Sequence, residues 1–280
     1  MSATEAPLNV EPSSASVRVP LPDSIEGSRP VTLVVGSGKG GVGKSLVSIL
    51  LAECMAADGR RVLLCDADQN LPNLHLLLGM KPVVQTEALL YGGISPESLL
   101  RLAGTNLWLL PGDPDTESVY SLQATERARL QRRLSELYLG FDAVIVDAGA
   151  GIEGVVRVST LGASRLLVVT TPEPTALMDA YALLKVVTAQ SAGLPIDILV
   201  NRTQDDSEGT VAFRRLASAC SQFLQHSIGW LGALPEDAAL QASVRSAEQL
   251  RGAISHTEAG RRLRGLLVAY PYVSQARSVS

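Results

Sequence analysis

Cysteine is scarce in this 280-residue sequence, which contains only Cys54, Cys65 and Cys220. The three are widely spaced and no Cys-x-x-Cys pair occurs, so neither a zinc ribbon nor a cysteine-ligated cluster is supported within one chain. We expect these thiols to serve as small apolar side chains of the core.

Charge and long apolar runs are limited too. Charged residues make up 19% of the chain, the net charge is −4 and the sequence pI is about 5.5. This balance argues against a broad nucleic-acid-binding surface, although a local patch formed by the arginines of residues 121–139 stays possible. No apolar run is long enough for a membrane-spanning helix, and the first residues lack the basic start and apolar core of a signal peptide. We therefore expect a cytoplasmic protein.

Lysine is sparse as well: the chain has four, and two of them, Lys39 and Lys44, lie in one glycine-rich stretch at residues 36–45. The apolar run at residues 31–35 precedes this stretch and is typical of a buried parallel strand. Apolar residues at helical spacing follow over residues 46–57. A strand, a glycine-rich turn and a helix in this order predict a phosphate-binding loop.

The chemistry of this loop follows from its residue types. Glycines let the backbone turn tightly and bring its N–H groups to phosphate oxygens, and the helix N-terminus adds a favourable dipole. Lys44 is predicted to reach the β- and γ-phosphates, and Ser45 to give its hydroxyl to Mg²⁺. The predicted nucleotide contacts of the loop are Gly38, Gly40, Gly41, Val42, Gly43, Lys44, Ser45 and Leu46.

Two further apolar runs end in aspartate. One leads into Asp66 and Asp68, whose side chains can face the same way because alternate residues of a strand do. The other leads into Asp147. Ligands bind at the carboxyl ends of strands in open α/β sheets, so these carboxylates are predicted near the loop. Helix capping is the alternative role for Asp68.

The placement of Lys39 resembles the deviant phosphate loop of the MinD/ParA ATPases, Lys-Gly-Gly-x-x-Lys-Ser/Thr. The resemblance implies that Lys39 reaches across a dimer interface to the partner's phosphates; without it, Lys39 could equally be a solvated loop lysine. It also implies a catalytic group of Lys39, Lys44 and Asp68, in which Asp68 orients the attacking water. Ser45, Asp68 and Asp147 would serve the metal.

Other parts of the same resemblance are less regular. Residues 149–151 resemble the segment whose N–H groups sense the γ-phosphate in this family. Family members often carry glycine where Asn70 stands and aspartate where His75 stands, which puts the hydrolysis rate in doubt more than nucleotide binding. We interpret His75 as a surface histidine beside an apolar run.

Residues 172–185 carry the finest resemblance. Their sequence is similar to the Glu-Pro-Thr…Asp-Ala-Tyr-Ala-Leu-Ile-Lys stretch of the flagellar-number regulators, the FlhG/FleN branch of the family. This implies control of flagellar number or placement, with a flagellar transcription activator, a flagellar signal-recognition-type GTPase and the inner membrane as partners, and nucleic acid as an unlikely partner. A MinD- or ParA-like role in division-site selection or DNA partition stays open, as does a nonhydrolysing ATP-binding module.

The base pocket is implied by position. Asn201 ends an apolar run and matches the family's asparagine that meets adenine. Pro235, Glu236 and Asp237 resemble the Gly-x-Ile-Pro-x-Asp element that lines the base. No Asn-Lys-x-Asp motif for guanine occurs, so ATP and Mg²⁺ are the expected ligands.

The chain divides into three parts on this reading. Residues 1–29 are predicted to be a flexible N-terminal tail, residues 30–270 the ATPase domain, and residues 271–280 a C-terminal tail. Strands and helices alternate through the domain, which predicts a doubly wound α/β fold with a mainly parallel sheet of about seven strands, a P-loop NTPase of the SIMIBI type by resemblance. We interpret the apolar and arginine-rich segment from residue 256 as the last helix packed on the domain, and a MinD-type membrane helix is the alternative. The expected activity is slow, Mg²⁺-dependent ATP hydrolysis coupled to dimerisation.

Overall fold

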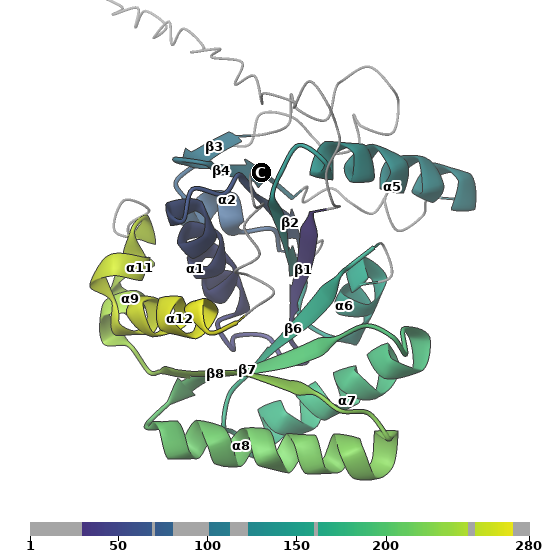
Figure 1. Ribbon diagram of the computed structural model, residues 1–280, viewed down its shortest axis with the longest axis vertical. Coiled ribbons are helices and arrows are strands. Elements are labelled where there is room, and N and C mark those ends of the chain that lie inside the picture. The colour runs from purple at the N-terminus through teal and green to yellow at the C-terminus, as the bar shows by residue number, and fades with distance from the viewer. Residues whose placement is uncertain are drawn as a thin grey trace, which may run out of the picture.

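The apolar runs of the sequence become the strands of one twisted sheet in the computed structural model (Figure 1). The structure describes residues 30–68, 71–80, 101–112, 123–159, 162–245 and 250–270. The strand order is β3-β4-β2-β5-β1-β6-β7-β8, and every neighbouring pair is parallel except β3 with β4. The strands are β1 (Val31–Gly36), β2 (Val62–Ala67), β3 (Arg101–Gly104), β4 (Leu107–Leu110), β5 (Ala143–Ala148), β6 (Arg165–Thr170), β7 (Ile196–Thr203) and β8 (Gly229–Pro235).

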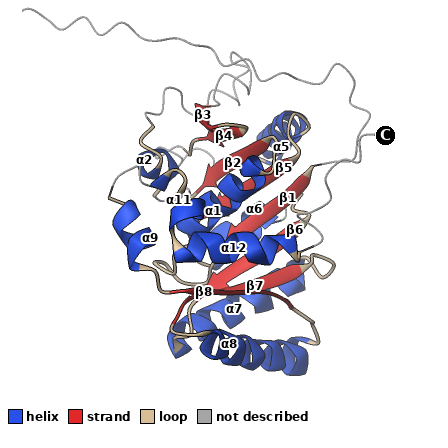
Figure 2. Ribbon diagram, turned by 60° about the vertical axis from the view of Figure 1, so that its left-hand side comes forward, coloured by secondary structure: helices blue, strands red, loops and turns tan. Residues whose placement is uncertain are grey.

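Helices cover both faces of the sheet, as parallel strands buried on both sides require (Figures 1 and 2). One apolar core joins the sheet to α1 (Lys44–Ala57), α9 (Ala238–Ser243), α11 (Ala253–His256) and α12 (Glu258–Val268). The other core lies under α5 (Ala124–Tyr138), α6 (Ile152–Ser159), α7 (Pro174–Gln190) and α8 (Asp206–Ala219). The remaining described helices are the short α2 (Leu74–Leu77) and the π-helical turn η2 (Cys220–Leu224) that continues α8.

This architecture confirms the predicted doubly wound, mainly parallel α/β fold. The sheet has one strand more than the seven or so expected, because the short antiparallel β3 carries no alternating pattern in its sequence, Arg-Leu-Ala-Gly. The helix α8 begins at Asp206, since the side chain of Asp205 accepts the Glu208 N–H at 2.8 Å and caps the helix.

The last helix packs on the domain, as the sequence predicted. Ala259, Leu263 and Leu267 of α12 are buried against α1 and β8. Within the described residues, no helix combines the length and the apolar character needed to cross a bilayer.

The three cysteines are core side chains, as expected. Cys54, Cys65 and Cys220 are free and buried, and they lie on α1, β2 and η2. Burial raises the pKa of Cys54 and Cys65 to about 12 and that of Cys220 to about 11.

Candidate functional site

The glycine-rich loop joins the carboxyl end of β1 to the first turn of α1. Gly43, the residue before α1, has φ 90°, a left-handed conformation that glycine adopts without steric cost. Gly38 sits directly on α7, because a Cβ atom there would come within 2.2 Å of the Asp179 carbonyl oxygen. The N-terminus of α1 has no side-chain cap and no acidic residue in its first turn, so its N–H groups are free of the partners that usually compete with an anion.

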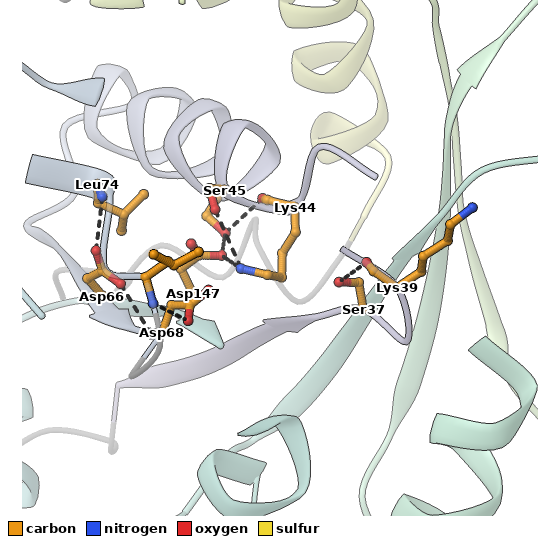
Figure 3. Close-up of polar contacts among 10 residues, drawn as sticks. Ser37, Lys39, Lys44, Ser45, Asp66, Asp68, Leu74 and Asp147 are labelled. Carbon is orange, nitrogen blue, oxygen red and sulfur yellow. Dashed lines mark hydrogen bonds and ion pairs between the residues drawn. The ribbon is translucent and has the colours of Figure 1, made fainter. Parts of the chain in front are cut away.

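Lys44 and Asp147 form a buried ion pair at the base of this loop (Figure 3). The Lys44 Nζ atom lies 2.7 Å from Asp147 Oδ1, and the Ser48 hydroxyl donates to the same oxygen at 2.9 Å. Lys44 Nζ is also 3.5 Å from the Ser45 hydroxyl oxygen. The second carboxylate oxygen of Asp147, Oδ2, is buried and has no hydrogen-bond partner. A fully buried carboxylate with one free oxygen beside a hydroxyl is a donor set that suits a hard cation.

Asp66 lies on β2 directly opposite Asp147 on β5. Its Oδ2 accepts the Leu74 N–H at 2.9 Å and its Oδ1 accepts the Asp68 N–H at 3.2 Å, so it shapes the chain that follows β2. Burial, reinforced by the Asp147 charge and opposed by the Leu74 N–H, raises the pKa of Asp66 to about 7. Asp66 therefore holds the backbone that follows β2 in place through these hydrogen bonds, a role that the spacing of the two aspartates did not indicate.

Asp68 and the segment after β5 meet beside the loop. Asp68 Oδ1 accepts the Leu71 N–H at 3.2 Å, and a Cβ atom on Gly149 would lie 3.2 Å from that oxygen. The Gly151 N–H donates to the Ser37 carbonyl at 2.9 Å and so joins this segment to the glycine-rich loop. The structure thus brings Asp68, Asp147 and the loop together at one edge of the sheet.

Lys39 points away from Lys44 in this arrangement (Figure 3). Its Nζ atom lies 3.0 Å from Glu173 Oε2 and 3.3 Å from the Thr175 hydroxyl, both at the start of α7. The two side chains of the ion pair remain 39% and 62% exposed, so water screens the attraction and the pair can open at little cost.

Asn201 holds the glycine-rich loop in place through a side-chain hydrogen bond. Its Nδ2 atom donates to the Val42 carbonyl at 2.8 Å, and it leaves no space for a Cβ atom on Gly43, which would come within 2.4 Å of Nδ2. The sequence placed Asn201 at the base pocket by position but did not indicate this contact, which spans 159 residues of the chain.

Pro235 is the last residue of β8, and Glu236 and Asp237 follow it at the same edge of the sheet. Asp237 is largely engaged, since its Oδ1 caps α9 through the N–H groups of Ala239 and Leu240 and its Oδ2 accepts the Ala259 N–H at 2.9 Å. Burial opposes the Asp237 charge, but these backbone N–H groups outweigh it and lower the pKa of the carboxyl. A base contact from Asp237 would therefore use its backbone.

His75 is buried, with 8% of its surface exposed, and the interpretation of a surface histidine was wrong. His75 lies in the single helical turn of α2, which turns its side chain inward. Burial lowers the pKa of this imidazole. Asn70, the other departure from the family pattern, lies outside the described residues.

Three observations fit a bound Mg·nucleotide. The uncapped N-terminus of α1 and the buried Lys44 suit phosphate oxygens. The free Oδ2 of Asp147 and the Ser45 hydroxyl are oxygen donors of the kind Mg²⁺ prefers, and Asp68 lies on the adjoining segment.

Comparison with known proteins agrees with this geometry. The family model ParA, described as the NUBPL iron-transfer P-loop NTPase, matches residues 30–264. The protein named antiactivator FleN of Pseudomonas aeruginosa is 33% identical over 222 residues, covering 79% of this chain and 78% of that protein. The flagellum site-determining protein YlxH of Helicobacter pylori is 30% identical over 222 residues, covering 78% of this chain and 74% of that protein.

Solved structures share the fold. The cell division ATPase MinD of Pyrococcus furiosus superposes with a TM-score of 0.68 at 25% identity, over 86% of this chain and 99% of that one.

Proposed function

Because the chain belongs to the ParA family of P-loop NTPases, we propose that it is an ATP-dependent switch that dimerises with ATP and separates after slow hydrolysis. The observation that carries this proposal is the buried pair of Lys44 and Asp147, with the half-buried Ser45 beside it, under an uncapped helix N-terminus. That group provides one fixed positive charge for phosphates and oxygen donors for a metal. P-loop ATPases use the same two features to bind Mg·ATP.

The position of each residue sets its role in hydrolysis. The loop N–H groups and Lys44 hold the phosphates, and Lys44 is positioned in advance by Asp147 and Ser48. Ser45, Asp68 and the free oxygen of Asp147 are the groups that would hold Mg²⁺, which would supply positive charge to offset the charge of the triphosphate. Asp68, joined to the loop through the segment of Gly149 and Gly151, orients the attacking water.

Lys39 is the residue that makes the switch a dimer. In one copy its ammonium group rests on Glu173 and Thr175, outside the site that Lys44 occupies. When a second copy approaches, Lys39 leaves this exposed pair and neutralises charge on the partner's triphosphate. ATP then favours the dimer by differential binding, and loss of the γ-phosphate removes that preference.

The flagellar branch gives the biological role. The relatives named antiactivator FleN and flagellum site-determining protein YlxH each match most of the chain, and we propose that this protein limits flagellar number or placement. A flagellar transcription activator, a flagellar signal-recognition-type GTPase and the inner membrane surface are the proposed partners. The similarity to MinD proteins supports a second candidate, division-site selection, which a fluorescent fusion would reveal by collecting at the septum.

The family description mentions iron transfer, and transfer of an iron–sulfur cluster held by cysteines fits this chain poorly. The three thiols lie on separate elements in the core, and burial raises the pKa of each well above the value of a free thiol. Cluster ligation requires thiolates gathered at one point.

A turnover assay tests the proposed activity. Phosphate release with ATP and Mg²⁺ is measured for the wild type and for Asp68→Ala. We expect Asp68→Ala to bind ATP but to hydrolyse it at least about tenfold more slowly, because the attacking water is no longer oriented. If the wild type binds ATP but releases no phosphate above background, the protein is a nonhydrolysing ATP-binding module.

A further inference from the structure

We propose that Arg202 is a nucleobase-binding residue that stacks its guanidinium on the face of the bound base, an inference that rests on the proposed function. Arg202 lies at the carboxyl end of β7, the same edge of the sheet as the glycine-rich loop, next to β8 (Figure 1). Neither the phosphate loop nor the aspartates require an arginine at this position.

The backbone of Arg202 has a conformation that is strained for a residue with a side chain. Its φ is 57°, in the left-handed region that side chains rarely adopt. Among the described residues, Asn106 and Gln225 are the other non-glycine residues with positive φ, and they lie in a turn and at the end of η2, where this conformation is ordinary. Arg202 alone of the three lies inside a strand.

A β-bulge causes this conformation. Val200 pairs with Ala233 and Thr203 with Pro235, so three steps along β7 face two steps along β8 and one residue of β7 is extra. Bulges commonly occur beside active sites, where they redirect a side chain.

Both neighbours of Arg202 are fixed, which forces the extra residue outward. Asn201 is buried and donates to the Val42 carbonyl of the loop. Thr203 is buried, and its hydroxyl donates to the Leu234 carbonyl at 3.1 Å. Its backbone carbonyl accepts the Glu236 N–H at 3.0 Å. The bulge therefore lies between Asn201, which holds the glycine-rich loop, and Thr203, which contacts the segment of the predicted base-pocket residues.

The guanidinium itself is available for a ligand. Arg202 is exposed, and within the described part of the chain its guanidinium takes part in no ion pair or hydrogen bond. Nearby acidic groups are already engaged: Asp205 caps α8, Asp206 pairs with Arg262, and Glu208 accepts the Gln204 N–H. A planar cation beside a base pocket is suited to stacking on a π-face, and this interaction tolerates different bases.

Binding to two ligands that differ by the nucleoside tests the assignment. Isothermal titration with Mg·ADP and with tripolyphosphate is performed on the wild type, Arg202→Gly, Arg202→Lys and the control Gln225→Gly. Glycine suits a positive φ, so both glycine variants should unfold at or above the wild-type temperature and remain folded. Gln225→Gly relieves the same kind of strain at a position away from the loop and should bind both ligands as the wild type does.

We expect Arg202→Gly to bind Mg·ADP about tenfold more weakly and tripolyphosphate unchanged, because only the base contact is lost. Arg202→Lys should lose most of the same affinity, since an ammonium group keeps the charge without the plane. Equal binding of Mg·ADP by Arg202→Gly and the wild type would overturn the assignment, as would a parallel loss for tripolyphosphate, which would place Arg202 on the phosphates. A folded wild-type protein that binds no Mg·ADP would instead remove the proposed function, and this assignment with it.

Discussion

Lys39 and Lys44 are five residues apart, yet their surroundings give them opposite properties. Lys44 is buried and paired with Asp147, whose carboxylate also accepts the Ser48 hydroxyl, so it stays at the base of the glycine-rich loop. Lys39 is paired with Glu173 across a surface where both side chains are partly in water. Because exposed pairs are worth only about 0–1 kcal/mol, Lys39 can be released while Lys44 cannot.

This contrast predicts the effect of Glu173→Gln. Losing the pair should change the free energy of unfolding by less than about 0.5 kcal/mol, but should lower the protein concentration needed for ATP-dependent dimerisation by up to about fivefold, because Lys39 no longer has to leave a partner. Sedimentation velocity across a range of concentrations measures the midpoint.

Two controls make this result specific. Asp58→Asn removes a comparably exposed partner of Arg264 at the far end of α1 and should leave dimerisation unchanged. In a Lys39→Ala background, Glu173→Gln should have no effect. A shift that persists in that background would mean that Glu173 acts through something other than Lys39.

At the scale of elements, the sequence predicted best what depends on local pattern. The glycine-rich loop, the strand runs that contain Asp66 and Asp147, and the final helix were all placed correctly, because each is encoded in a short run of neighbouring residues. The missed features depend on distant partners. Asn201 supports Val42, and Lys39 meets Glu173, only because β1, β6 and β7 are neighbours in the sheet.

Local pattern also failed where an element is very short. The helix α2 has four residues and β3 has four, too few for a periodic signal. The interpretation of His75 as a surface residue failed for this reason, since one turn of helix is enough to bury it. The roles of the site residues in catalysis stay predictions.

The joint between α11 and α12 gives an element-scale prediction. Thr257 is fully buried; its hydroxyl donates to the Ala253 carbonyl and accepts the Gly260 N–H at 3.1 Å, which caps α12. Thr257→Val keeps the shape but leaves the Gly260 N–H unpaired, while the Ala253 carbonyl keeps its bond from the Thr257 N–H, so we expect a loss of about 1–2 kcal/mol in the free energy of unfolding.

Thr257→Ser is the matched control, because it keeps the hydroxyl and loses only a methyl group. Urea denaturation should show Thr257→Val clearly below Thr257→Ser. Equal stabilities, or a less stable serine variant, would mean that packing of the methyl group and not the cap holds α12 in place.

For the whole molecule, the arrangement of elements places everything reactive at one edge. The loop, Asp68, Asp147, the bulge at Arg202 and the start of α7 all lie at the carboxyl ends of the parallel strands. The last helix packs against α1 and β8, whereas Lys39 contacts Glu173 at the start of α7, so a second copy can meet this edge without disturbing the core. The proposed switch therefore needs two copies facing each other across their nucleotides.

The most direct test is the mass of Lys39→Ala in solution, measured by light scattering with a nonhydrolysable ATP analogue and Mg²⁺. The wild type should have about twice the chain mass of 29.5 kDa, while Lys39→Ala should bind the analogue and keep the mass of one chain. A Lys39→Ala protein that forms the same dimer as the wild type would contradict the account, because the first lysine would then have no role in a second copy.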